Sequence, residues 1–200
     1  STLSKAQTEI SDSELLEFSL FIRDNYGLRL DWYNQTSLKR RLSRVLSLNR
    51  ISNLSHLTLL LAKNRDYFRR FTESFTVQVT ELFREPKALR ELKTSVFPFL
   101  SRILHPKILI VGCSSGEEMI SLCILLEEAG LLNKSSITVT DISQKAIDKA
   151  KQFSVSKTKI EHAQMNYRQA GGETELSNFY QSTSSMCYFN EHLFQNVEWS

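Results

Sequence analysis

The sequence predicts an α/β protein in which a helical N-terminal part precedes a parallel sheet. Two observations lead to this prediction. Apolar residues recur at helical spacing through about the first hundred residues, whereas from Lys107 onward short aliphatic runs alternate with amphipathic stretches. An order of strand, helix, strand and helix gives a parallel sheet with right-handed crossovers. The change of pattern after His105-Pro106 places a domain boundary near residues 101–106.

Several helices are expected in the first hundred residues. Ser11 and Glu14 form a capping-box pattern, and Gly27 interrupts the helix that begins there. The next two helices are expected in SLKRRLSRVLSLN and LSHLTLLLAKN. The stretch RDYFRRFTESFTVQVTELFRE predicts a further helical region, with a break near residues 77–80, where most side chains are β-branched. PKALRELKTSVFPFLSRIL completes the series, with Pro86 in its first turn.

The second hundred residues contain the predicted sheet. The aliphatic runs KILIVG and SSITVTD are expected as its first two strands. GEEMISLCILLEEAG and SQKAIDKAKQF are expected as the helices that follow those strands. A polar stretch around Gly171-Gly172 is consistent with an inserted hairpin, and a third strand is expected at Met186–Phe189.

Composition disfavours several classes of protein. No apolar run approaches the roughly 18 residues of a membrane span, and the opening STLSKAQTEIS lacks the apolar core of a signal peptide. The three cysteines show no C-x-x-C spacing, so neither a disulfide framework nor a metal site is predicted. We expect a cytoplasmic protein without membrane insertion. Residues 1–100 carry 16 Lys and Arg against 11 Asp and Glu, which favours an acidic partner.

The stretch ILIVGCSSGEEMISL contains the most informative turn of the chain. Its G-C-S-S-G matches G-x-S-x-G, the turn that carries the nucleophile of α/β-hydrolases, and Asp141 and His192 follow Ser114 in the order of a catalytic triad. Three features argue against a hydrolase. No H-G-G-G turn precedes Gly112, helices stand where that fold has strands, and few strands follow.

The same turn is consistent with a cofactor site at the start of a helix. It lacks G-K-[ST] and is therefore no P-loop. Glu117 and Glu118 either complement the helix dipole or favour a cationic ligand over a pyrophosphate. S-adenosylmethionine carries a sulfonium and an ammonium group and no phosphate. Asp141, at the end of the next strand, either caps the following helix or holds the hydroxyl pair of a ribose.

Three motifs together resemble the CheR-type chemotaxis receptor methyltransferases: V-T-E-L-F-R-E, G-C-S-S-G-E-E and T-D-I-S. The resemblance extends from about Phe18 to Phe194. It implies a small helical domain over residues 1–100 and a partial Rossmann-like class I methyltransferase domain over residues 101–200, with a small inserted β-subdomain. It also implies methyl transfer from S-adenosylmethionine to glutamate side chains of chemotaxis receptors, with S-adenosylhomocysteine as product.

The family continues through further strands beyond the point that corresponds to Ser200. The chain therefore resembles a family member without the C-terminal part of its catalytic domain. The alternative is a degenerate or truncated signalling module that binds a partner without catalysis. In either case an exposed sheet edge favours a homodimer.

The resemblance assigns cofactor contacts residue by residue. Arg84, in T-x-x-x-R with Thr80, would bind the carboxylate of the cofactor, a role that suits a guanidinium. A helix-face ion pair with Glu81 or Glu85 is the alternative for Arg84. Glu118 and Asp141 match the family's two acids. The remaining cofactor contacts are Gly112, Cys113 and Ser114, together with Gln78 and His192-Leu193, which stand where the family has Asn and Asn-Leu.

Three basic residues resemble the substrate-binding helix of the family: Arg40, Arg41 and Arg44. A basic face could meet a glutamate-rich receptor helix, or it could simply be solvated. Nucleic acid is not expected, because the stripe has no interleaved aromatic residues. No catalytic base is assigned, since a glutamate substrate is already ionised at neutral pH and can attack the methyl group directly.

Overall fold

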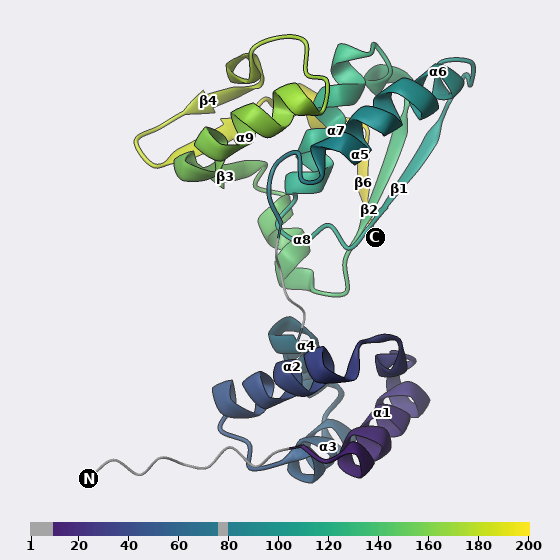
Figure 1. Ribbon diagram of the computed structural model, residues 1–200, viewed down its shortest axis with the longest axis vertical. Coiled ribbons are helices and arrows are strands. Elements are labelled where there is room, and N and C mark those ends of the chain that lie inside the picture. Colours follow the sequence, from purple (N-terminus) through teal and green to yellow (C-terminus); the bar gives the residue numbers. More distant parts are fainter. Residues whose placement is uncertain (1–9, 76–79) are drawn as a thin grey trace. The chain divides into compact units, whose positions relative to one another are not determined.

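The structure, a computed structural model, describes residues 10–75 and 80–200. It consists of two compact units, Ser1–Val77 and Gln78–Ser200 (Figure 1). The division between the units lies well before residues 101–106, where the change of sequence pattern predicts a boundary. The physical reason is that Leu82, Phe83 and Phe97 are buried in the core of the second unit. The helical residues 86–100 thus belong to the α/β unit.

The first unit is all-helical over its described residues. Its α-helices are α1 (Asp12–Tyr26), α2 (Gln35–Leu48), α3 (Leu54–Lys63) and α4 (Arg65–Phe75), with the short 3-10 turn η1 (Leu30–Trp32) between the first two. Apolar faces of the four helices enclose one core, which includes Phe18, Ile22, Leu42, Leu57, Leu61, Phe71 and Phe75.

The predicted capping box of the first helix is confirmed. Glu14 N donates to Ser11 Oγ at 3.2 Å, and Ser11 N donates to Glu14 Oε2 at 2.9 Å. These reciprocal bonds satisfy two donors that the first helical turn would otherwise leave unpaired. The helix ends at Gly27, whose φ of 71° is readily adopted by glycine.

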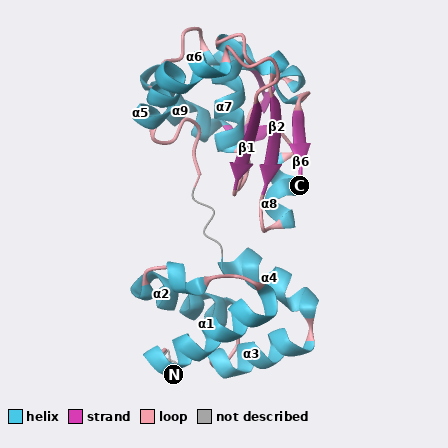
Figure 2. Ribbon diagram, turned by 90° about the vertical axis from the view of Figure 1, so that its right-hand side faces the viewer, coloured by secondary structure: helices cyan, strands magenta, loops and turns pink. Residues whose placement is uncertain are grey.

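A parallel sheet forms the centre of the second unit. Its strands are β1 (Lys107–Val111), β2 (Ser136–Thr140) and β6 (Val197–Trp199), in the order β1-β2-β6. Figure 2 shows the three arrows pointing the same way, so that their carboxyl ends share one edge of the sheet. The third parallel strand is β6; the expected strand at Met186–Phe189 exists but belongs to another sheet.

Two helices follow the first two strands of the parallel sheet. They are α7 (Glu117–Glu128) and α8 (Gln144–Ala150), in agreement with the predicted alternation. Nine of the twelve residues of α7 are buried, which marks it as a core helix. None of the helices in the described ranges has the length and apolar run that crossing a membrane would require.

A small antiparallel sheet is inserted between β2 and β6. It contains β3 (Ser154–Ser156), β4 (Tyr180–Ser182) and β5 (Met186–Phe189), in the order β3-β5-β4. The helix α9 (Lys157–Gln169) connects its first two strands in sequence (Figure 1). The α/β fold with a helical first unit and an inserted β-subdomain is therefore confirmed. The helix α9 is an addition that the sequence analysis did not predict.

The Gly171-Gly172 pair follows α9 and is not the tip of a hairpin. A Cβ at Gly172 would lie 2.2 Å from Cε2 of Tyr167, so the chain passes too close to that ring for any other residue. The loop is anchored by Glu128, whose Oε1 accepts hydrogen bonds from the backbone N of Glu173 and of Thr174, both at 3.0 Å. The hairpin turn lies between β4 and β5 instead.

The predicted helix that begins at Pro86 is divided into three pieces. They are α5 (Pro86–Glu91), a π-helical turn η2 (Leu92–Val96) and α6 (Phe97–Leu100). Pro98 has no N–H to donate to the carbonyl of Thr94, which explains a local change of hydrogen bonding. Three further 3-10 turns complete the unit: η3 (Leu132–Lys134), η4 (Leu176–Phe179) and η5 (Glu191–Phe194).

Candidate functional site

The glycine-rich turn after β1 is tied to the end of β2. The backbone N of Gly112 and of Cys113 both donate to Thr140 O, at 2.9 and 3.0 Å. Gly112 and Gly116 adopt φ values of 83° and 94°, and Ser114 adopts 51°. Gly116 is needed also for space, because a Cβ there would lie 3.0 Å from the Cβ of Ala150 on α8. The turn therefore combines a left-handed backbone with close helix packing.

Asp141 joins the two strand ends at this edge of the sheet. Its Oδ2 accepts a hydrogen bond from Ser114 N at 2.8 Å, and its Oδ1 accepts one from Ser143 N at 2.9 Å. The N-cap of α8 is Ser143, whose side chain accepts from Ala146 N. The capping interpretation of Asp141 is thus wrong, and its carboxylate lies against the glycine-rich turn.

The two glutamates at the start of α7 have different surroundings. Glu117 is 1% exposed, forms an ion pair with Lys159 of α9 and accepts a hydrogen bond from Ser115 Oγ at 2.7 Å. Glu118 is exposed, and no hydrogen bond or ion pair joins its carboxylate to another described residue. Of the two carboxylates, only that of Glu118 is available to a ligand.

A hydrolase triad is not assembled at the turn. His192 Nε2 lies 3.6 Å from Oε1 of Glu127, near the far end of α7. At 1.5 Å per residue, Glu127 is about 16 Å along the helix from Gly116. Asp141 is bonded to backbone N–H groups, and no histidine contacts Ser114 in the described ranges.

Cys113 is unsuited to act as a nucleophile. Burial raises the pKa of its thiol from 9.0 to about 11, and the negative charge of Asp141 contributes in the same direction. The thiol is therefore protonated at neutral pH, and the thiolate is the reactive form. Cys113 acts as a compact turn residue. Within residues 10–75 and 80–200, no three His, Cys, Asp or Glu side chains are grouped as a metal ion would need.

Arg84 lies in a turn and not on a helix. The side chains of Leu82 and Phe83 are buried, whereas the side chain of Arg84 is 57% exposed. Its Nη2 is 4.0 Å from Oε1 of its neighbour Glu85, which is a loose, solvated contact. The pair with Glu85 that the alternative interpretation names is therefore present, but it does not lie on a helix face. Thr80, four residues earlier, is partly buried.

The structure does not bring His192 and Leu193 to the glycine-rich turn. Leu193 is fully buried in the core of the unit, and His192 lies beside Glu127. Both residues precede β6, at the amino end of the parallel strands, whereas the turn follows the carboxyl end of β1. We therefore leave them out of the proposed site. Gln78 lies outside the described residues.

Two side chains that the sequence does not single out hold residues of the site in place. Lys159 neutralises buried Glu117, and Ser121 Oγ accepts a hydrogen bond from Phe83 N at 2.8 Å. Lys159 is 42 residues distant from its partner, so no local pattern could reveal it. Ser121 leaves a faint signal, since it is the one hydroxyl in the apolar run of α7.

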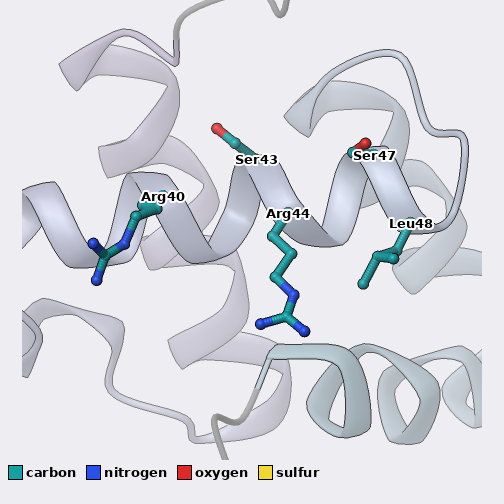
Figure 3. Close-up of a pocket in the computed structure, with 5 residues that line it drawn as sticks. All are labelled: Arg40, Ser43, Arg44, Ser47 and Leu48. Carbon is teal, nitrogen blue, oxygen red and sulfur yellow. The ribbon is translucent and has the colours of Figure 1, made fainter.

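In the first unit, α2 presents a basic stripe. Arg40, Arg44 and Leu48 project from the same side of the helix, beside a shallow groove (Figure 3). Arg40 and Arg44 are exposed, and neither forms an ion pair with another described residue. Arg41 differs, because its guanidinium lies 5.5 Å from the centre of the Tyr33 ring. The groove is lined by Arg40, Ser43, Arg44, Ser47 and Leu48.

Comparison with protein families assigns both units. Residues 13–76 match the all-alpha domain of CheR methyltransferases, and residues 78–199 match the S-adenosylmethionine (SAM) binding domain of CheR methyltransferases. The chain belongs to the CheR methyltransferase family. The junction between the two matched domains coincides with the junction between the two structural units of this CheR chain.

Relatives of this CheR chain come from several bacteria. It is 31% identical to the methyltransferase Cher3 of Pseudomonas putida over 194 residues, which cover 97% of the chain and 70% of that relative. It is 31% identical to chemotaxis protein methyltransferase 1 of Vibrio cholerae over 147 residues, which cover 70% and 54% of the two proteins. The chain thus spans about half the length of the Vibrio relative.

The cofactor of the CheR family is S-adenosylmethionine, and the turn fits its chemistry. The backbone N–H groups of Gly112, Cys113 and Ser114 are all bonded within the protein, so they do not form a nest for a phosphate. Exposed Glu118 adds negative charge, which suits a cation. No atom lies within 4 Å of the position that a Cβ at Gly112 would occupy, which leaves room above the turn.

Proposed function

We propose that the Gln78–Ser200 unit holds S-adenosylmethionine at the carboxyl ends of β1 and β2, and that the whole protein methylates glutamate side chains of chemotaxis receptors. The observation that supports this most directly is the hydrogen bond from Ser114 N to Asp141 Oδ2. It places the strand-end acid against the turn after the neighbouring strand, which is where a nucleoside binds in open parallel sheets.

Each cofactor-binding side chain has a distinct role in this proposal. Each oxygen of Asp141 accepts one backbone N–H and retains a second acceptor site for a ribose hydroxyl. Arg84 pairs with the carboxylate of the cofactor through its planar guanidinium. Glu118 favours the positive charges of the ligand. These roles concern binding and orientation and require no proton transfer.

The reaction requires little acid–base catalysis by the protein. S-adenosylmethionine supplies a methyl group activated by a positively charged sulfur. A glutamate with a pKa near 4.3 is a carboxylate at neutral pH and attacks without a general base. The protein aligns the two reactants and excludes water from them. A protonated, buried Cys113 and a distant His192 are both compatible with this chemistry.

The basic stripe of α2 is proposed as the surface that meets the receptor. Arg40 and Arg44 are four residues apart, so their charges repeat with the spacing of one helical turn. A receptor helix with glutamates at similar spacing would complement them, while Leu48 offers an apolar contact. Exposed charges of this kind mainly accelerate encounter and fix orientation.

Calorimetric titration of S-adenosylhomocysteine into the chain tests the cofactor site. Asp141→Asn should weaken binding about tenfold or more, because a charged acceptor is replaced. Asp148→Asn on the exposed side of α8 removes the same charge away from the turn and should leave the affinity unchanged. Equal affinities of wild type and Asp141→Asn would contradict the assignment. A wild-type protein of full length that binds no S-adenosylhomocysteine would favour the non-catalytic signalling module.

A further inference from the structure

The segment that carries Arg84 has an unusual backbone. Phe83 and Glu85 have φ values of 53° and 51°, so Arg84 stands between two residues in the left-handed region. Non-glycine residues adopt this region rarely, and they remain there only when their surroundings hold them. The position of Arg84 therefore depends on whatever anchors the residues beside it.

Side-chain packing provides the first anchor. Leu82 is 1% exposed and Phe83 is fully buried in the core of the second unit. The ring of Phe83 lies 5.0 Å from the ring of Tyr167 on α9, measured between centroids. Packing of this kind fixes the depth of the segment, but it specifies the backbone orientation less sharply than a hydrogen bond does, because apolar contact has little directionality.

A directional anchor comes from Ser121 on α7. Its Oγ accepts the hydrogen bond from Phe83 N at 2.8 Å and donates to Glu117 O at 2.6 Å. Both functions of the hydroxyl are thus used, and both bonds are buried. Without this oxygen, Phe83 N–H would lose its partner in the core, which is costly for a buried donor.

The same hydroxyl connects the segment to the glycine-rich turn. Glu117, whose carbonyl accepts from Ser121, follows directly after Gly116 at the end of that turn. The Glu117 side chain is itself held by Ser115 Oγ and by Lys159. A short chain of hydrogen bonds therefore runs from the neighbour of Arg84 to the turn where the cofactor is proposed to bind.

We infer that Ser121 is a positioning residue that holds Leu82–Arg84 against α7 and thereby places Arg84 for the carboxylate of S-adenosylmethionine. This inference rests on the proposed function as far as the ligand is concerned. The anchoring itself can be measured without any ligand, so the two can be tested separately.

Hydrogen exchange measured by mass spectrometry tests the anchoring. In Ser121→Ala, peptides covering residues 80–85 should exchange faster than in wild type. Ser135→Ala is the matched control, because Ser135 is also buried and its Oγ donates to Leu131 O at 2.8 Å, away from this segment. Ser121→Cys retains a weak acceptor and should give an intermediate rate. Unchanged exchange of the segment in Ser121→Ala would overturn the inference.

S-adenosylhomocysteine affinity tests whether the anchor acts through Arg84. Ser121→Ala should weaken binding about fivefold, as expected for one hydrogen bond, whereas Ser135→Ala should not. In an Arg84→Ala background, adding Ser121→Ala should weaken binding no further. If the affinity losses of Ser121→Ala and Arg84→Ala add up in the double variant, Ser121 does not act through Arg84. A general structural role of Ser121 predicts such additive losses. If the wild type does not bind S-adenosylhomocysteine, the proposed function is contradicted. The hydrogen-exchange experiment would then still test whether Ser121 anchors the segment.

Discussion

Glu117 and Glu118 are neighbours in the sequence but serve different purposes in the structure. The carboxylate of Glu117 is buried against Lys159 and Ser115 and therefore supports the turn from inside. The carboxylate of Glu118 faces solvent at the start of the same helix. A rotation of about 100° between consecutive helical residues is enough to separate a structural acid from one available to a ligand.

The ion pair of Glu117 should be necessary for stability. Lys159→Met leaves the buried carboxylate without its counter-charge and should lower the free energy of unfolding by about 1–3 kcal/mol. This is less than for a fully buried pair, because the Lys159 side chain is 41% exposed. Lys157→Met, at an exposed position on the same helix, should have little effect. Urea unfolding measures both, and equal stability of the Lys159 variant and wild type would exclude this role.

Cys123 should make the protein sensitive to alkaline pH. Burial raises the pKa of its thiol from 9.0 to about 12. Above pH 9 the unfolded chain loses this proton while the folded chain retains it, so the free energy of unfolding falls as pH rises from 9 toward 12. Cys123→Ala should lower stability overall but make this fall shallower. Chemical unfolding at pH 8 to 11 measures the free energy of unfolding of both proteins. If it falls equally steeply with pH in wild type and Cys123→Ala, the prediction is refuted.

At the scale of elements, α7 organises the second unit. Its first turn closes the glycine-rich turn, its middle receives the Arg84 segment through Ser121, and its last residue, Glu128, anchors the loop after α9. A helix that buries most of its residues can contact many elements at once. Small displacements of α7 should therefore affect cofactor binding and stability together.

Gly116 determines how closely α7 approaches α8. Gly116→Ala should cost about 1–3 kcal/mol of stability, because φ is 94° and the new Cβ would lie 3.0 Å from that of Ala150. Gly130→Ala serves as a reference without crowding, since its φ of 66° is also positive and no atom lies within 4 Å of its Cβ position. Thermal unfolding should show the larger loss for Gly116→Ala. Equal losses would mean that crowding against α8 is unimportant.

At the scale of the whole molecule, the proposed function assigns cofactor binding and receptor binding to different units. The glycine-rich turn belongs to the Gln78–Ser200 unit, and the basic stripe of α2 belongs to the Ser1–Val77 unit. The two functions should consequently be separable by mutation. A homodimer, the other whole-molecule expectation, stays a prediction; β1 borders its sheet and exposes Leu109 and Val111.

Charge reversal of the α2 stripe should weaken receptor binding and leave cofactor binding unchanged. Arg40→Glu with Arg44→Glu should weaken binding of a glutamate-rich receptor-helix peptide about tenfold at low salt, and less at high salt. Arg65→Glu with Arg69→Glu makes the same change at the same spacing on α4 and serves as control. Fluorescence anisotropy measures peptide binding, and calorimetry should show unchanged S-adenosylhomocysteine affinity. A similar loss in both double variants would indicate a general charge effect.

Much of the fold could be predicted from neighbouring residues. The capping box at Ser11, the end of α1 at Gly27 and the start of α5 at Pro86 all depend on contacts within four residues. The strands β1 and β2 were predicted from their aliphatic runs. The helix α9 was not predicted because its sequence is mostly polar. Its apolar face consists of only three buried residues, Ile160, Ala163 and Tyr167.

The candidate site was predictable in part. The turn at Gly112–Gly116 and the acid Asp141 lie where strand ends of a parallel sheet must meet, so strand order alone suggested their proximity. Arg84 was assigned from a motif, and its turn conformation was not predicted. His192 was assigned in the same way, and the structure places it near the far end of α7.

By itself the sequence determined the order of helices and strands, the glycine-rich turn and the family, because these follow from local periodicity and short motifs. Only the tertiary structure decided where the units divide, which sheet receives Met186–Phe189, which glutamate is buried, and that Ser121 binds the segment before Arg84. Each of these depends on contacts between residues far apart in the chain. Such contacts form when whole elements pack, and no pattern within a few residues records them.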